Sequence, residues 1–182
     1  PALKVGMADG IALTAQASYA PAAVDIARAD VTWKQATAHV DGRIGLQGKR
    51  QLNLNASADQ LQVGEILEAL NTTGVPATGT LSARGMVGGT LDRPMATVVA
   101  QGSNLVAYEE QIGTFNADVR LDGRDLVLSN LVIDKPQPEG AGKLTASGTY
   151  NLDRETYKVD LKSDNLRLVN LTLPGGQHLR GA

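Results

Sequence analysis

Hydrophobic and polar residues alternate with a period of two along most of this chain. Over residues 144–152 every second position is apolar or small, and the positions between are polar. After a turn at 153–156 the alternation resumes, with Tyr157, Val159 and Leu161 separated by charged residues. Such alternation is typical of a strand with one side in an apolar environment and the other in water. The stretch therefore predicts an antiparallel hairpin with one apolar face and one polar face.

The same hairpin pattern occurs three times along the chain. The copies span approximately residues 38–63, 79–106 and 140–173, and each ends in a short polar sequence followed by leucine: DQL, SNL and DNL. From the central glycine to that leucine the intervals are 19, 20 and 18 residues. Self-similarity at nearly constant spacing indicates a repeat architecture. We therefore expect residues 1–182 to form a single β-repeat segment whose loops differ in length.

Strands also precede the first hairpin copy. Alternation over Ile11–Tyr19 predicts a strand, and Pro21 ends it because proline cannot donate to a β-ladder. Val24–Ala27 and Asp30–Lys34 predict a second strand that contains a bulge. Its inward-facing residues are expected to be Ile26, Val31 and Trp33.

Further strands are expected between and after the other copies. Residues 111–133 form a hairpin pattern that turns at Asp122–Gly123, a dipeptide favoured in tight β-turns. The Pro-containing stretch 135–142 predicts a loop. Val169–Leu173 predicts an edge strand that continues the last copy until Pro174–Gly176 ends it.

One segment carries a helical pattern. Residues 63–71, VGEILEALN, place Val63, Ile66 and Leu67 on one side and glutamates on the other. A helix of about nine residues is not stable alone. We expect it to cap one part of the sheet.

These elements restrict the architecture. The strands need a partner for their apolar faces, and one short helix is too small to cover them. The possible arrangements are a sandwich, a closed barrel or a sheet curled along its length. Only 3% of the residues are aromatic and 20 are glycine, which favours a thin, elongated layer over a compact core. We expect an all-β fold: an elongated, curled antiparallel sheet that forms a groove with a hydrophobic interior.

The alternation also assigns residues to the interior of that groove, because successive residues of a strand point to opposite faces of the sheet. The assignment depends on the register, since a shift of one residue would exchange the two faces. The residues expected to line the groove are Ile44, Leu46, Leu52, Leu54, Leu81, Val87, Val98, Phe115, Val119, Leu121, Leu126, Leu128, Leu144, Tyr150, Val159, Leu161 and Leu166.

Little in the sequence points to catalysis. The chain has no cysteine, and its two histidines, His39 and His178, have no partners at the spacing of a metal site or catalytic triad. Acidic residues such as Asp118 and the pair Asp160/Asp164 stand at outward or turn positions, where solvation explains them. The glycines of GMVGG are not followed by the Lys-Ser/Thr of a phosphate loop. We expect no catalytic residue, metal site or cofactor.

The net charge of −2 also argues against a nucleic-acid partner, since such proteins carry a basic surface. No signal peptide and no transmembrane run is present, and the chain starts at a proline. We therefore expect it to be a fragment of a longer protein, whose targeting and anchoring segments lie outside it.

The order of the motifs resembles a known family. A short helix precedes the run G-x-L-x-A-x-G-x-V-x-G-T-L-x-x-P at 79–94, which is followed by an N-L strand and then by G-x-L-x-A-S-G-x-Y at 142–150. This order, over about residues 38–173, resembles the TamB and AsmA-like envelope proteins of Gram-negative bacteria.

The resemblance implies a location and a role. Proteins of this family are anchored in the inner membrane and span the periplasm as a curled sheet with a hydrophobic interior. They work with an Omp85-class outer-membrane partner, in phospholipid transport and in assembly of outer-membrane β-barrel proteins such as autotransporters. The expectation is a non-enzymatic periplasmic conduit for phospholipid or other acyl chains.

A second hypothesis stays open at this stage. The chain is alternatively a module that binds outer-membrane protein clients by strand addition, which requires unpaired strand edges. The sequence suggests such edges near Ile11–Tyr19 and Leu166–Leu173.

Overall fold

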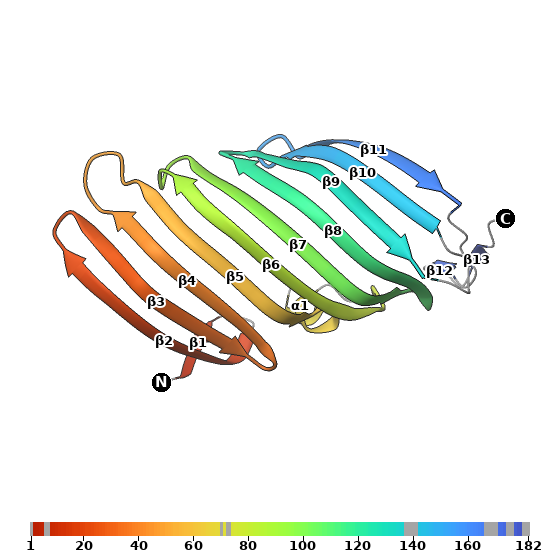
Figure 1. Cartoon of the computed structure of the whole chain (residues 1–182), viewed down its shortest axis with the longest axis horizontal. Helices are drawn as coiled ribbons and strands as arrows, with labels where there is room; N and C mark the ends of the chain where they lie inside the picture. The colour runs from red at the N-terminus through yellow and green to blue at the C-terminus, as the bar shows by residue number, and fades with distance from the viewer. Residues whose placement is uncertain are drawn as a thin grey trace.

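The structure is a computed structural model of the chain. It describes residues 2–5, 8–69, 71, 74–136, 142–165, 171–173 and 177–179. Strands dominate this part of the chain, and the elongated sheet that they form is open (Figure 1).

Eleven strands form one antiparallel sheet in which every strand pairs with its neighbours in sequence, in the order β1 to β11. The first and last strands do not pair with each other, so the sheet does not close into a barrel. The expected all-β, curled, elongated antiparallel sheet is thus confirmed. The strands are β1 (Ala2–Val5), β2 (Ala8–Ala20), β3 (Ala23–Trp33), β4 (Ala36–Gly45), β5 (Leu52–Gln62), β6 (Ala77–Gly89), β7 (Pro94–Ala107), β8 (Glu110–Asp122), β9 (Asp125–Lys135), β10 (Gly142–Asn151) and β11 (Thr156–Asp164).

Irregularities in pairing accompany the curl of the sheet. Most neighbouring pairs contain a register shift, including β3 with β4 between Ile26 and Ala29, where the sequence predicts a bulge. A β-bulge bends its strand and increases the local twist. The pairs β4–β5 and β10–β11, by contrast, run without a shift.

The helix in the described part of the chain lies beside the ends of the middle strands of the sheet (Figure 1). α1 (Val63–Ala69) follows β5 directly and packs against β5 and β6, and Figure 1 shows it at the lower ends of these strands. Lys34, in the turn between β3 and β4, lies 3.5 Å from Glu65 and 3.5 Å from Glu68. These ion pairs hold the helix against the neighbouring hairpin. The helix is shorter than expected, since Asn71 lies in a turn.

One prediction about the ends of the sheet was wrong, and another holds for part of its strand. Val169–Leu173 was expected to continue the last copy as an edge strand, but β12 (Leu171–Leu173) pairs instead with β13 (Gln177–Leu179) in a separate two-stranded sheet. Residues 166–170, including the predicted lining residue Leu166, lie outside the described residues. At the other end, β1 pairs with the first part of β2, so β2 is only partly an edge.

Gly102 on β7 shows how glycine shapes the sheet. It is buried beneath the ring of Phe115, its cross-strand partner on β8, and an added Cβ would overlap that ring. Gly102→Ala is therefore expected to displace Phe115 and destabilise the fold by about 1–3 kcal/mol in urea unfolding.

Gly88→Ala on β6 is the matched control, because its added Cβ would meet only the Leu52 carbonyl oxygen, 3.9 Å away. This change is expected to be neutral or slightly stabilising, since alanine lowers the entropy of the unfolded chain. Equal costs for the two substitutions would contradict the role assigned to the Phe115 contact.

Candidate functional site

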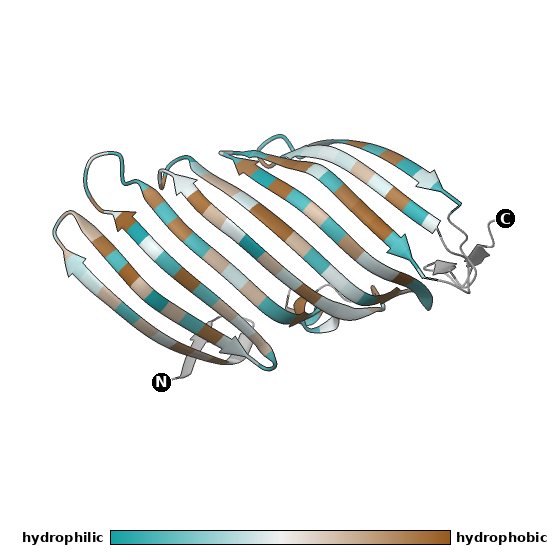
Figure 2. Ribbon diagram, viewed as in Figure 1, coloured by the Kyte–Doolittle hydropathy of each residue, from teal (hydrophilic) through white to brown (hydrophobic). Residues whose placement is uncertain are grey.

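Apolar side chains form rows that cross the strands of the sheet. Directly paired residues on antiparallel strands project to the same side, so the register identifies each row. Figure 2 shows the underlying alternation of hydrophobic and hydrophilic residues along the strands. Three rows run from β2 to β11 without a charged residue: Leu13, Val31, Ala38, Ala58, Ala83, Ala100, Ala117, Leu131, Ala146, Leu161; then Ala15, Ala29, Val40, Ala56, Gly85, Val98, Val119, Leu128, Gly148, Val159; then Ala17, Ile26, Gly42, Leu54, Val87, Ala96, Leu121, Leu126, Tyr150, Tyr157.

We call the side of the sheet that carries these rows the apolar face and the opposite side the polar face. The ten strands that share the rows span about 43 Å, taking strand spacing as roughly 4.8 Å. Two of the rows consist mainly of alanine, glycine and valine, while larger residues such as Leu54 and Tyr150 stand in the third. A shorter row on the same face lies next to the first of the three rows and contains Leu61, Leu81, Phe115, Ile133 and Leu144.

The register places most of the predicted lining residues together on the apolar face. Leu46 is the exception among the described ones, since it follows β4 in the loop, where its amide donates to the Ala22 carbonyl. The residues that share the apolar face are Ile44, Leu52, Leu54, Leu81, Val87, Val98, Phe115, Val119, Leu121, Leu126, Leu128, Leu144, Tyr150, Val159 and Leu161.

No second layer packs on this face within the described part of the chain. Apart from α1 on β5 and β6, the extensive contacts between elements join neighbouring strands. Among the residues whose side chains are described, the fully buried hydrophobic ones are all alanines, Ala23, Ala36, Ala117 and Ala146. The larger side chains of the rows are therefore only half-buried, and those at the β11 edge are well exposed, with Leu161 64% exposed. A continuous apolar surface of this extent is typical of a binding face.

A buried ion pair lies near one end of the apolar face. Lys135, at the end of β9, donates a hydrogen bond to Glu110, at the start of β8, and the two side chains are 2% and 1% exposed. Lys135 is two residues from Ile133, so it points to the apolar side. The alternation pattern did not reveal this pair, since the partners are 25 residues apart in sequence and each looks like an ordinary strand-end charge.

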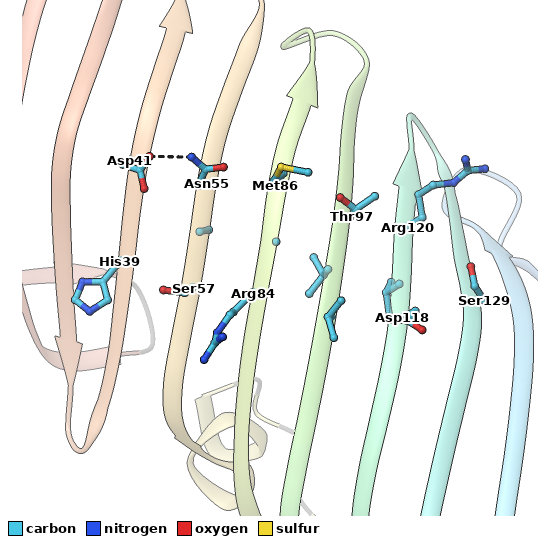
Figure 3. A pocket seen from close by; sticks show the side chains of 15 residues that line it. His39, Asp41, Asn55, Ser57, Arg84, Met86, Thr97, Asp118, Arg120 and Ser129 are labelled. Carbon is cyan, nitrogen blue, oxygen red and sulfur yellow. Dashed lines mark hydrogen bonds between the residues drawn. The ribbon is translucent and has the colours of Figure 1, made fainter.

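The polar face carries a broad, shallow hollow of about 640 Å³ over β4 to β9. Figure 3 shows the side chains that line it, with α1 behind the sheet. Arg84 and Met86 come from β6, Val99 from β7, and Asp118 and Arg120 from β8. Because the apolar face is on the other side of the sheet, the two surfaces do not compete for an occupant.

The charged residues considered as chemical candidates lie mostly in local contacts on the polar face. Arg28 lies 2.5 Å from Asp30 and lowers the pKa of that carboxyl; partial burial opposes the shift, and a further contact with His39 supports it. Asp118 accepts from the Asn130 amide at 3.3 Å, and Asp122 from Arg93 at 3.1 Å. These contacts are those of an ordinary solvated strand surface.

The described residues contain no cluster of three or more potential metal ligands. His178 lies in β13. Among the described residues, no helix has the length and hydrophobicity needed to cross a membrane.

Comparison with known proteins gave no match. No protein-family model matches the chain, and no match was found among curated proteins or among solved structures.

Proposed function

We propose that this chain is a segment of a non-enzymatic conduit that carries phospholipid or other acyl chains along its apolar face. The observation that supports this proposal is the set of three unbroken apolar rows across ten strands, uncovered among the described residues. Each row runs perpendicular to the strands, along the long axis of the sheet. A guest chain lying along the rows meets apolar contacts at every strand.

The energetics favour an acyl guest. Exposure of a methylene group to water costs about 0.8 kcal/mol, so a whole acyl chain costs on the order of 10 kcal/mol in free solution. An aliphatic surface removes most of this cost. The rows carry no charge, and their only hydroxyl groups belong to Tyr150 and Tyr157 at one end. Binding without fixed polar partners is similar at each position, which allows a chain to slide.

The setting of the proposed conduit follows from the family resemblance. In a TamB-like protein the segment would stand in the periplasm of a Gram-negative bacterium, in a chain anchored in the inner membrane, and pass lipid between the inner and outer membranes. Other parts of that chain would contact an Omp85-class outer-membrane protein. The motifs at 79–94 and 142–150 support this proposed location and this proposed partner, through the resemblance to TamB-like proteins.

The experiment that tests the proposal is mass spectrometry of the chain purified from a bacterial host without detergent. Native spectra and organic extracts are expected to show phospholipid at near-stoichiometric amounts. A folded chain without bound lipid, which also fails to take up lipid from added phospholipid vesicles, would overturn the proposal.

A second candidate function has its own supporting observation. β11 is the last strand of the sheet, its ladder with β10 is unshifted over nine pairs, and its outer side has no neighbour among the described residues. Tyr157, Val159 and Leu161 are 78%, 53% and 64% exposed there. A regular, exposed edge accepts an added strand. The edge proposed for an outer-membrane protein client is therefore β11; of the two edges that the sequence suggested, Leu171–Leu173 pairs with β13, and Ile11–Tyr19 is partly covered by β1.

Site-specific photocrosslinking distinguishes this candidate. A photoreactive residue at Asp160 of β11 is expected to capture an autotransporter client during its assembly, while one at Asn53, on the interior strand β5, does not. Val159→Lys with Leu161→Lys is expected to lower the yield at Asp160 about tenfold, because charges on the apolar side of an edge oppose pairing. Equal capture at both positions would exclude addition at the edge.

A further inference from the structure

Three apolar side chains stand out on the polar face. Met86 on β6 is 62% exposed, and Val99 and Met95 on β7 are 50% and 43% exposed. They lie together because Met86 pairs with Thr97, which stands between Met95 and Val99 along β7. Their neighbours on this face are mostly polar, and nothing in the strand pattern requires apolar residues here. Methionine is common at surfaces that bind protein partners, since its side chain adapts to different shapes.

Two unpaired cations flank this apolar patch. Arg84 pairs in register with Val99, and Arg120 pairs with Thr97. Within the described part of the chain, neither guanidinium makes an ion pair or a side-chain hydrogen bond. The acids of the hollow are already engaged by amide donors: Asp41 accepts from Asn55 at 2.8 Å, and Asp118 accepts from Asn130.

The spacing of the two arginines limits what can engage both. Arg84 and Arg120 are two strands apart, and Arg120 is two residues along β8 from Asp118, the residue in line with Arg84. This arrangement puts their Cα atoms about 12 Å apart. Figure 3 shows Arg84 directed toward Ser57 and Arg120 directed toward the other side of the hollow, so their guanidinium groups diverge. A single phosphate or carboxylate cannot reach both groups, whereas two acidic side chains on one peptide can.

We propose that the hollow on the polar face binds an acidic segment of a partner protein, with two carboxylates paired to Arg84 and Arg120 and an apolar side chain between them against Met86 and Val99. Asp41 and Asp118 balance the charge of the two arginines, so the hollow lacks the extended basic surface that nucleic acid requires. Carboxylate–guanidinium pairs supply the charge complementarity, and the apolar patch supplies contact area. The site does not depend on the proposed lipid function, since it lies on the opposite side of the sheet.

A short synthetic peptide tests the site directly. Acetyl-Ser-Glu-Thr-Leu-Thr-Glu-Ser-amide has two glutamates four residues apart, about 13 Å in an extended chain, with a leucine between them. The chain contains three methionines, so methyl-labelled methionine gives three NMR signals. Titration is expected to shift the Met86 signal most strongly. The peptide with glutamine in place of glutamate is expected to bind about fivefold more weakly, from the loss of two exposed ion pairs.

Charge-reversal variants distinguish binding at Arg84 and Arg120 from a general effect of the net charge of the protein. Arg84→Glu with Arg120→Glu is expected to weaken peptide binding about tenfold or more, from the loss of two exposed ion pairs and the added repulsion. Arg43→Glu with Arg93→Glu changes the net charge equally but removes arginines that already pair with Asp25 and Asp122. This control is expected to keep the affinity within about twofold.

Three results would overturn the proposal. Equal weakening by the two double variants would reduce the effect to net charge. A Met86 shift of the same size with inorganic phosphate would indicate a simple anion site. The absence of a Met86 shift at millimolar peptide, with the fold intact, would show that the hollow does not recognise this chemistry.

Discussion

Leu54→Asp combined with Val119→Asp is expected to abolish the copurification of phospholipid with this chain. Both residues stand in the central rows of the apolar face, on β5 and β8. An acyl chain that covers these positions would desolvate two unpaired carboxylates, at a cost of several kcal/mol. The lipid signal in native mass spectra is therefore expected to fall by about 100-fold or more.

The matched control places the same charges on the opposite face. Asn53→Asp and Asn116→Asp lie on the same two strands, are isosteric, and point to the polar side. This double variant is expected to retain lipid at the wild-type level. Circular dichroism of both variants shows whether the sheet is intact. Lipid retention by a folded Leu54→Asp/Val119→Asp chain would place the lipid elsewhere and refute the conduit.

Lys135→Met is expected to destabilise the fold by about 3–5 kcal/mol, the usual cost of breaking a buried ion pair. The change removes the ammonium group that hydrogen-bonds Glu110, whose side chain is 1% exposed. Without Lys135, the buried carboxylate of Glu110 destabilises the fold by more than the intact ion pair stabilises it, because the cost of desolvating the carboxylate is no longer offset. Urea unfolding measures the loss as a lower midpoint at constant slope.

The double variant Glu110→Leu with Lys135→Met tests that reasoning. Replacing both charges by apolar side chains of similar volume is expected to restore stability to within about 1 kcal/mol of the wild type. Arg43→Met, which breaks the exposed pair with Asp25, is expected to cost less than about 1 kcal/mol. A small effect of Lys135→Met alone would show that Glu110 remains satisfied without it.

The alternation of residues was sufficient to predict most of the fold. It placed strands and turns correctly from Ile11 to Thr156, including the bulge after Ile26, since each strand has one apolar and one polar side. It also grouped the lining residues on one face, because pairing in an antiparallel sheet preserves the side to which residues project. Leu46 lies outside the paired rows because the alternation extends one position beyond the end of β4.

Contacts between distant residues were not predictable in the same way. The exposed edge at β11 and the burial of Glu110 beside Lys135 depend on which strands become neighbours. The hollow around Arg84 also escaped notice, since outward residues on β4 to β9 look like separate solvated positions until the register brings them together.

By itself, the sequence determined the class of fold and the two faces of the sheet, because periodicity is a local property of each strand. The composition favoured an open, curled sheet, but only the tertiary structure decided where its edges lie and which side chains from different strands meet. These features depend on register and on strand order, which are set by contacts between residues far apart in the chain. A sandwich or a closed barrel with the same alternation would bury the apolar rows, so the exposed binding face is a consequence of the open arrangement.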